Sequence, residues 1–486
     1  MLQDAPRQLA VIGGGISGLA AAYRLTRLGR ERGGKVEVIL LEAQQRLGGV
    51  IHSHHEEGLL LEEGPDAFIT TKPWALKLCQ ELGLQDDLIR TQSTPHGSFI
   101  LRDNTLHPMP EGFLLFAPTS LWPFLRTPLF TWRGKLRMAM DLVLPRRRRD
   151  GGAPQDESLE AFVIRRLGRE ALERMAQPLV AGIYTGDARQ LSLQATMPQM
   201  LEMEEQERSI IRAMWKNRRA MRKRGLDTRQ DAGARYGLFL TLRRGLGTLI
   251  ERLAGQLPEG SVRTGCRVVA LEHCGEAPQW KVRIEGGASL RADGICVALP
   301  APPAAALLGG LLPDLAKQLA GVPYASSAIV NLAFRRRSIA HPLDGMGFVV
   351  PRSEDKSLIA CSFSSVKFEG RSPRDVALLR AFVGGAVQPE RYALSDADMV
   401  QALLGDLRPV LGIKEEPLLA RVSRHPGAMA QYHLGHLDKV RAIEALRRRV
   451  PGFALAGNAY RGIGIPDCIH SADQAAQVLI EQVPAS

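Results

Sequence analysis

The sequence has few cysteines, and none of them stands in a paired motif. Six cysteines are scattered over 486 residues, without a C-x-x-C pair or the ligand spacing of a metal site. Dispersed cysteines are typical of reduced thiols in a cytosolic protein. We therefore expect a cytoplasmic protein that holds no metal. The cysteines are Cys79, Cys266, Cys274, Cys296, Cys361 and Cys468.

Long apolar runs are also missing. No stretch of about 18 apolar residues is present, so we expect no membrane-spanning helix. The first residues, MLQDAPRQLA, lack the charged start and apolar core of a signal peptide. A hydrophobic share of 45% and a charged share of 23% are ordinary for a globular protein, and the length predicts two or three domains.

Acidic residues are outnumbered, and the formal net charge is +12. The excess is concentrated in Arg146–Arg149 and in the segment Lys216–Arg224. Neither run carries interleaved aromatic residues or a nucleic-acid-binding module, so we expect no nucleic-acid partner. Solvated loops or helix faces are the favoured interpretation, and attraction to anionic phospholipid or to a polyanionic substrate is the alternative.

The strongest motif is a glycine-rich turn near the start of the chain. The apolar run Leu9–Ile12 predicts a buried strand, and the helical pattern Leu19–Leu28 follows it. Between them, Gly13-Gly14-Gly15-Ile16-Ser17-Gly18 forms a G-x-G-x-x-G turn. The three motif glycines Gly13, Gly15 and Gly18 allow, in order, a tight turn, close approach to a pyrophosphate and helix–sheet packing. The helix N-terminus would attract the phosphates, so we expect a bound dinucleotide.

The next segment favours FAD over NAD. A second apolar run ends on Glu42, whose carboxylate can accept hydrogen bonds from ribose hydroxyls. The segment from Glu42 and Ala43 through Arg46 to Gly48 and Gly49 matches the E-x-x-x-R-x-G-G pattern of amine-oxidase-type FAD enzymes. We interpret Arg46 as facing the pyrophosphate and the two glycines as a close passage of the chain past the cofactor. A plain NAD dehydrogenase does not need this second motif.

Later segments complete the predicted cofactor site. The Gly64-Pro65-Asp66 turn would pass near the isoalloxazine ring. The run Asp293–Pro300 predicts another buried parallel strand, and Phe453–Asn458, including Gly457 and Asn458, predicts a last one. Gly464, Ile465 and Pro466 then lead into a final helix. The site would thus be assembled from the first, middle and last parts of the chain.

We therefore predict an α/β fold, in which a Rossmann-type FAD-binding domain is interleaved with a mixed α/β substrate domain and a helical lobe. The FAD-binding domain comprises residues 1–96, 246–310 and 451–486. The helical lobe, for membrane contact or substrate access, comprises 97–206. A basic connector with part of the substrate domain spans 207–245, and the rest of that domain spans 311–450.

An apolar, aromatic segment interrupted by prolines lies at Gly112–Trp132. The prolines exclude one long helix. Two interpretations stay open for this segment. It could form the core of the helical lobe, or an exposed surface that docks on a membrane or guards the entrance for an apolar substrate.

By these motifs the chain resembles the bacterial-type protoporphyrinogen/coproporphyrinogen III oxidases, FAD-dependent members of the amine-oxidase-like flavoprotein superfamily. The resemblance covers nearly the whole chain. The segments that carry it are Glu63–Phe68, Thr105–Pro110, Ala181–Asp187, Phe382–Gly385, Gln431–His436 and Gly462–Ile469.

The resemblance implies an oxidase that converts protoporphyrinogen IX to protoporphyrin IX in heme biosynthesis, with coproporphyrinogen III as the alternative substrate. A flavin amine oxidase or desaturase, or a flavin-binding factor without turnover, is less favoured. It also implies six-electron oxidation by molecular oxygen with release of H2O2, non-covalent FAD, and Val268 among the cofactor contacts. Gly182, Val349 and Phe382 would line the substrate pocket. The resemblance further implies peripheral contact with the inner face of the cell membrane and hand-off of the product to a ferrochelatase.

Four positions depart from the family pattern. Gly97 and Ser98 stand where many relatives have an arginine thought to hold a propionate, and His425 and Ala430 replace a tryptophan and a proline.

No catalytic base is predicted, because a bound cofactor carries the difficult chemistry. His433 and His436 could form a metal or acid/base pair, but ordinary hydrogen-bonded histidines are favoured. Cys468 could attach the flavin covalently, but a buried small apolar side chain is favoured.

Overall fold

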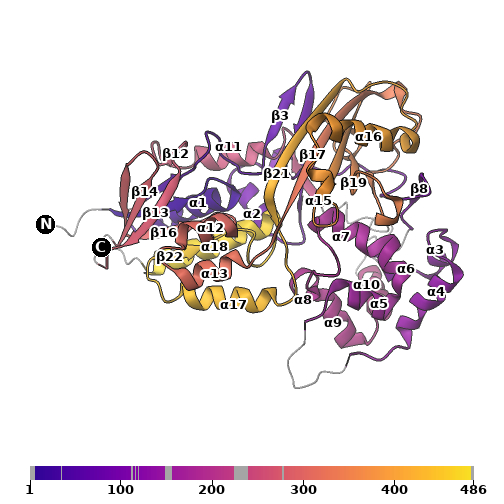
Figure 1. Cartoon of the computed structure of the whole chain (residues 1–486), viewed down its shortest axis with the longest axis horizontal. Helices are drawn as coiled ribbons and strands as arrows, with labels where there is room; N and C mark the ends of the chain where they lie inside the picture. Colours follow the sequence, from indigo (N-terminus) through magenta and orange to yellow (C-terminus); the bar gives the residue numbers. More distant parts are fainter. Residues whose placement is uncertain are drawn as a thin grey trace.

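The computed structural model describes residues 6–33, 36–110, 113–114, 117–118, 120–147, 156–223, 239–275 and 279–482. Figure 1 shows an elongated molecule with a parallel sheet and its helices at one end, where both termini lie. A second sheet and a helical lobe occupy the other end. The α/β fold class predicted from the sequence is confirmed.

The parallel sheet joins three distant parts of the chain. Its strand order is β12–β2–β1–β16–β22, and all its pairings are parallel. The strand β16 lies between β1 and β22, so the first, middle and last parts of the chain meet as predicted. The strands are β1 (Arg7–Ile12), β2 (Val36–Leu41), β12 (Val262–Arg263), β16 (Gly294–Val297) and β22 (Phe453–Leu455).

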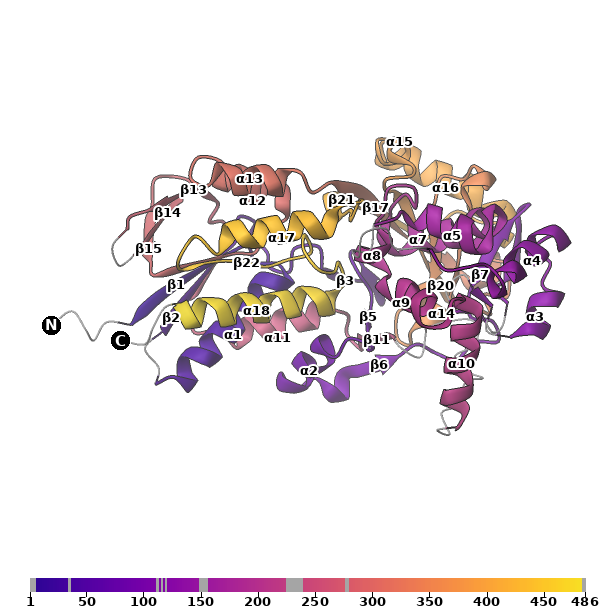
Figure 2. The same ribbon diagram turned by 90° about the horizontal axis from the view of Figure 1, so that it is seen from below.

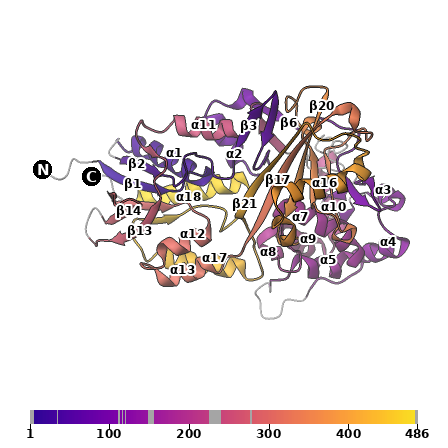
Figure 3. The same ribbon diagram turned by 45° about the horizontal axis from the view of Figure 1, so that its top comes forward.

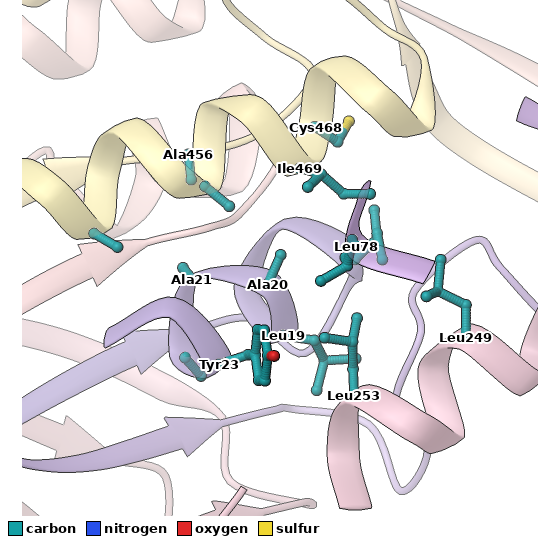
Figure 4. Close-up of a cluster of buried hydrophobic side chains, with 14 of the residues drawn as sticks. Leu19, Ala20, Ala21, Tyr23, Leu78, Leu249, Leu253, Ala456, Cys468 and Ile469 are labelled. Carbon is teal, nitrogen blue, oxygen red and sulfur yellow. The ribbon is translucent and has the colours of Figure 1, made fainter. Parts of the chain in front are cut away.

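The two faces of this sheet are covered by different elements because side chains alternate along a strand. Leu9 and Val11 of β1 belong to the apolar cluster that contains α1 (Ile16–Glu31), α11 (Gly247–Gly255) and α18 (Ile465–Gln482). Figure 4 shows side chains from these three helices gathered in that cluster. Ala10 and Ile12 face a second cluster on the other side of the sheet.

Helices and a small antiparallel sheet form this second side. Figure 2 shows the helices together beside β22. The helices are α12 (Ala301–Leu308), α13 (Pro313–Ala320) and α17 (His436–Arg447). The strands of the antiparallel sheet are β13 (Val268–His273), β14 (Trp280–Ile284) and β15 (Ser289–Ala292).

A seven-stranded mixed sheet dominates the other end, with the order β21–β17–β20–β19–β18–β7–β8. Its long strands β17 and β21 run between the two ends of the molecule (Figure 3). The helix α16 (Asp396–Leu411) shares an apolar cluster with one face of this sheet. The strands are β7 (Phe99–Arg102), β8 (Thr105–Pro108), β17 (Tyr324–Arg335), β18 (Gly347–Val349), β19 (Ala360–Phe363), β20 (Val376–Gly384) and β21 (Leu419–Ala430).

The helical lobe follows β8 in the chain and has its own apolar core. Ser158 caps α5 by accepting a hydrogen bond from the Ala161 N–H. The helices are α3 (Leu121–Arg126), α4 (Trp132–Ala139), α5 (Leu159–Leu167), α6 (Arg169–Ala171), α7 (Gln177–Tyr184), α8 (Leu193–Thr196), α9 (Pro198–Glu207) and α10 (Ile210–Lys223), with a π-helix at Leu172–Ala176 and a 3-10 helix at Met140–Leu142.

Smaller elements connect these parts. They are the hairpin β3 (Ser53–Glu56) and β4 (Leu59–Glu62), the sheet of β5 (Phe68–Ile69), β11 (Phe239–Leu242) and β6 (Leu88–Arg90), the pair β9 (Phe113–Leu114) and β10 (Ala117–Pro118), and the helices α2 (Trp74–Glu81), α14 (Ser364–Lys367) and α15 (Pro389–Tyr392). In the part of the chain that the structure describes, no helix is long and apolar enough to cross a membrane.

The elements differ from the predicted boundaries at two places. We expected 97–206 as the helical lobe, but β7 and β8 belong to the seven-stranded sheet, because β7 pairs with β18. The lobe extends past 206, since Ile210, Ile211 and Met214 of α10 are buried in its core. The basic connector 207–245 therefore includes a lobe helix and β11, which pairs with β5 and β6. The three-part division itself stays a prediction.

The apolar segment Gly112–Trp132 is partly buried and partly exposed. Phe113, Phe124, Leu129 and Phe130 are buried in the core of the lobe, whereas Trp122 is 63% exposed. Several neighbouring residues of this segment lie outside the described residues.

Candidate flavin-binding site

The turn between β1 and α1 has the geometry of a phosphate cradle. Gly13 has φ +107°, and a Cβ there would lie 2.7 Å from the Ala298 carbonyl oxygen. A Cβ on Gly18 would lie 1.8 Å from the carbonyl oxygen of Gly13, so only glycine lets the helix pack this close. By contrast, a Cβ on Gly15 would meet nothing within 4 Å. Gly15 therefore borders open space, as close approach of a ligand requires.

The N-terminus of α1 is suited to an anion. Its N-cap is Gly15, which provides no side-chain cap, and its first turn contains no acidic residue. Ile16 and Ser17 follow and are buried. Uncapped N–H groups and the positive end of the helix dipole favour a phosphate at this position.

Glu42 and the two glycines of the second motif lie against this turn. The Glu42 carboxylate accepts hydrogen bonds from the N–H groups of Gly14, at 2.6 Å, and Gln44, at 2.7 Å. The Gly48 N–H donates to the Gly14 carbonyl at 2.8 Å, and a Cβ on Gly49 would lie 3.3 Å from Gly15 Cα. The E-x-x-x-R-x-G-G segment thus forms one wall of the cradle.

Three further predicted contacts lie at its edge. Ala43 and Arg46 are exposed beside Glu42, and Arg46 Nη1 donates to the Leu47 carbonyl at 3.3 Å. Val268 begins β13, shortly after Cys266, whose N–H donates to the Glu42 carbonyl at 2.8 Å. The roles of these residues as cofactor contacts stay predictions.

The Gly64-Pro65-Asp66 turn lies next to the cradle. A Cβ on Gly64 would lie 1.7 Å from the carbonyl oxygen of Val50, the residue after Gly49. The Asp66 carboxylate is paired with Lys367 at 2.8 Å and with Arg380 at 3.2 Å. Burial alone would raise the pKa of Asp66, but Lys367 and Arg380 outweigh it and hold the pKa well below its usual range. The carboxylate therefore anchors the turn within the protein.

Two tyrosines hold the turn after β22. The Asn458 side chain accepts from the Tyr324 hydroxyl at 2.9 Å and donates to the Ala428 carbonyl at 3.1 Å. The Tyr432 hydroxyl donates to the Asn458 carbonyl at 2.7 Å and accepts from the Gly462 N–H at 2.8 Å. The predicted contact Asn458 thus uses its side chain inside the protein. Sequence reasoning missed both tyrosines, because their partners are distant in the chain.

The remaining predicted cofactor contacts surround this turn. Gly457 has φ +137°, and its N–H donates to the Ser471 hydroxyl at 3.1 Å. A Cβ on Gly464 would approach only the side chains of Asp467 and Pro466, at 3.4 Å and 3.6 Å. Ile465 and Pro466 form the buried first turn of α18.

The predicted substrate residues share one face of the seven-stranded sheet. Val349, Ala360 and Phe382 are paired across β18, β19 and β20, so their side chains point the same way. The next residues along these strands, such as Cys361, belong to the cluster with α16 on the opposite face. A Cβ on Gly182 of α7 would meet only Val349 within 4 Å, at 3.6 Å. The structure therefore brings Gly182 and Val349 together, with Phe382 two strands away.

Comparison with known proteins identifies the family. The sequence model of the protein family of flavin containing amine oxidoreductases matches residues 16–480 of this chain. The chain belongs to this family. A coproporphyrinogen III oxidase of Bacillus subtilis is 36% identical over 96% of this chain and 97% of that protein. A protoporphyrinogen oxidase of Bos taurus is 33% identical over 99% of this chain and its whole length. A crystal structure from Exiguobacterium sp. 255-15 has a TM-score of 0.84 and 33% identity, covering 98% of this chain and 99% of that chain.

Membership of a flavin-containing family agrees with the geometry of the cradle. The open space at Gly15, the uncapped N-terminus of α1 and the Glu42 carboxylate are suited to the pyrophosphate and ribose of a dinucleotide. FAD is therefore the cofactor of this flavoprotein, and it would supply the two-electron chemistry.

His436 and Cys468 of this flavoprotein have structural partners. His436 Nε2 lies 2.9 Å from the Tyr460 carbonyl, its ring stacks on Tyr432, and burial lowers its pKa to about 4. Burial also lowers the pKa of His433. Cys468 lies in the cluster of Figure 4, and burial raises its pKa to about 12, so it stays a protonated thiol. Within the described ranges, no group of three or more His, Cys, Asp or Glu side chains could hold a metal ion.

Two of the positions that depart from the porphyrinogen oxidase pattern, His425 and Ser98, are held within the protein, and so are two arginines near them in the chain. His425 Nε2 lies 2.6 Å from the Glu63 carbonyl, just before the Gly64 turn, and burial lowers the pKa of His425. Ser98 is buried. Arg102 donates to the Pro128 carbonyl at 2.9 Å. Arg424 contacts Asp396 and two backbone carbonyls.

Proposed function

We propose that this flavoprotein is an oxidase that converts a porphyrinogen into a porphyrin. The observation that carries the proposal is the row of Val349 and Phe382 on one sheet face, opposite a Gly182 that adds no side chain of its own. A flat apolar tetrapyrrole suits such a face. The full-length similarity to porphyrinogen oxidases supports the same conclusion.

The proposed reaction balances without a catalytic base. A porphyrinogen loses six electrons and six protons in three two-electron rounds, and each round reduces one molecule of oxygen to H2O2. FAD, when bound, accepts the two electrons of each round. The chain itself holds the cofactor at the glycine turn and orients the substrate against Phe382.

Protoporphyrinogen IX is the substrate that the sequence predicts. Coproporphyrinogen III is the second candidate, and the bacterial relatives favour it. Relatives of that name from Bacillus subtilis and Propionibacterium freudenreichii are 36% and 35% identical to this chain.

The test offers each porphyrinogen separately to the purified, FAD-loaded protein in air. We expect porphyrin fluorescence and H2O2 to rise together, in a ratio of one porphyrin to three H2O2, well above a control without protein. Faster turnover of the vinyl substrate would support protoporphyrinogen, and faster turnover of the four-carboxylate substrate would support coproporphyrinogen. A yellow, folded preparation that leaves both unchanged would contradict the proposal.

We further propose that the lobe makes peripheral contact with a membrane. Trp132, Leu136 and Met140 recur every fourth residue, so they share one helix face, and both Trp132 and Leu136 are 71% exposed. Trp122 is exposed nearby, with the Arg126 guanidinium 4.5 Å from its ring centroid. Exposed apolar side chains beside cations are suited to an anionic lipid surface.

The membrane proposal predicts that Trp132→Ser with Leu136→Ser weakens sedimentation with anionic phosphatidylglycerol vesicles by at least about tenfold, because burying one such side chain is worth about 1.5–3 kcal/mol. The matched control is Leu418→Ser with Leu434→Ser, two exposed leucines outside the lobe. Equal binding of all three proteins would refute the contact.

We also propose that the protein hands its porphyrin product to a ferrochelatase. Co-elution of the two purified proteins from a sizing column would test this hand-off.

A further inference from the structure

Arg380 is a buried cation in the middle of β20. It is 2% exposed, and its strand neighbours are Ser362 on β19 and Asn331 on β17. It stands two residues before Phe382, so both side chains point to the same face of the sheet. Arginine is rarely buried without specific partners.

The guanidinium of Arg380 contacts both the Gly64–Asp66 turn and the ring of Phe382. One nitrogen, Nη2, donates to the Gly64 carbonyl, and Nη1 pairs with the Asp66 carboxylate at 3.2 Å. Its central carbon lies 4.8 Å from the centroid of the Phe382 ring. A guanidinium is planar and always charged, so it can donate hydrogen bonds in its plane while its face lies on an aromatic ring, a geometry that the tetrahedral ammonium of lysine does not offer.

The turn that Arg380 holds adjoins the cradle directly. Gly49 packs on Gly15, Val50 follows Gly49, and the backbone of Gly64 packs on the Val50 carbonyl. Arg380 therefore lies between the chain that borders the flavin cradle and Phe382, whose ring is predicted to line the substrate pocket.

Lys367 allows the contacts of Arg380 to be distinguished from simple charge pairing with Asp66. Its ammonium pairs with the same Asp66 oxygen at 2.8 Å and lies 5.1 Å from the ring centroid of Phe368. Arg380 and Lys367 thus neutralise one carboxylate, but the hydrogen bond to Gly64 and the contact with Phe382 belong to Arg380.

We propose that Arg380 is a positioning residue, which fixes the spacing between the Gly64–Asp66 turn and the Phe382 ring. The proposal rests on the proposed function, in which FAD lies at that turn and a porphyrinogen lies on that ring. In this role Arg380 touches neither reactant and acts through the two groups that do.

The test compares Arg380→Lys with Lys367→Met, both FAD-loaded and both shown to be folded by circular dichroism. For Arg380→Lys we expect kcat to fall at least about tenfold with KM within about threefold, because misplacement by about 1 Å costs up to about 100-fold. The long-wavelength absorption band of the flavin should shift. Lys367→Met should lower kcat less than Arg380→Lys does, because it removes one charge from Asp66 but neither the hydrogen bond to Gly64 nor the contact with Phe382.

A double-mutant cycle with Phe382→Leu gives a second measurement. The effects of Arg380→Lys and Phe382→Leu on kcat should be non-additive by at least about threefold, because residues in contact are coupled. Additive effects would overturn the proposal, as would an unchanged flavin band in Arg380→Lys or an equal fall of kcat in Lys367→Met. If the wild-type protein oxidises no porphyrinogen, the proposed function fails, and the flavin band still tests Arg380.

Discussion

Gly15→Val is expected to remove FAD binding while the protein stays folded. Gly15 has φ −71° and ψ 177°, an extended conformation that any residue adopts, and a Cβ there meets no atom within 4 Å. The substitution therefore costs the apoprotein little. The new side chain would occupy the space through which a pyrophosphate approaches the backbone and the N-terminus of α1.

We expect the affinity for FAD, measured by titration of the apoprotein, to fall at least about 100-fold, which corresponds to about 2.7 kcal/mol. The thermal midpoint of the apoprotein should not change. Gly405→Val is the matched control, because Gly405 lies exposed in α16 and a Cβ there also meets nothing within 4 Å. Retention of FAD by Gly15→Val would show that the dinucleotide does not bind at this turn.

Arg166→Met is expected to lower the free energy of unfolding of the lobe by about 3–5 kcal/mol, because removal of one partner leaves a buried charge uncompensated. Arg166 and Asp141 are fully buried and joined by a hydrogen bond of 2.6 Å from Nε to Oδ1. Arg166 also donates to the carbonyl of Arg208, and Asp141 accepts from the Ser209 hydroxyl. The pair therefore ties together four segments of the lobe: the 3-10 helix, α5, α9 and α10.

Urea denaturation followed by circular dichroism measures this loss. The matched control is Arg169→Met, whose ion pair with Glu173 is exposed and spans 3.8 Å. Exposed pairs contribute at most about 1 kcal/mol, so the control should resemble the wild type. An Arg166→Met protein as stable as the control would show that the buried pair does not hold the lobe together.

The sequence predicted the elements whose signal is local. The strand β1, the glycine turn and α1 follow from an apolar run, three spaced glycines and a helical pattern within Leu9–Leu28. The buried strand β16 was predicted from its apolar residues, and its place between β1 and β22 agrees with that prediction. Cofactor identity was predictable for the same reason, since the motif from Glu42 to Gly49 is contiguous.

Features that depend on distant partners were not predictable. In sequence, Arg380 is a charged residue in a strand, which is typical of an exposed face, and its burial depends on Gly64 and Asp66. Tyr324 and Tyr432 gain their role from Asn458, far along the chain. The predicted start of the lobe was wrong because β7 pairs with β18 in the seven-stranded sheet. No local sequence pattern identifies the partner of a strand.

Electron transfer from a porphyrinogen to the bound flavin can be observed directly when oxygen is absent. The purified FAD-loaded protein is mixed anaerobically with protoporphyrinogen IX or coproporphyrinogen III, and flavin absorbance and porphyrin fluorescence are recorded together. We expect that at least one porphyrinogen bleaches the flavin, and that air then restores its colour and releases free porphyrin. A flavin that stays oxidised with both porphyrinogens, in a protein that holds FAD, would show that the protein is not a porphyrinogen oxidase.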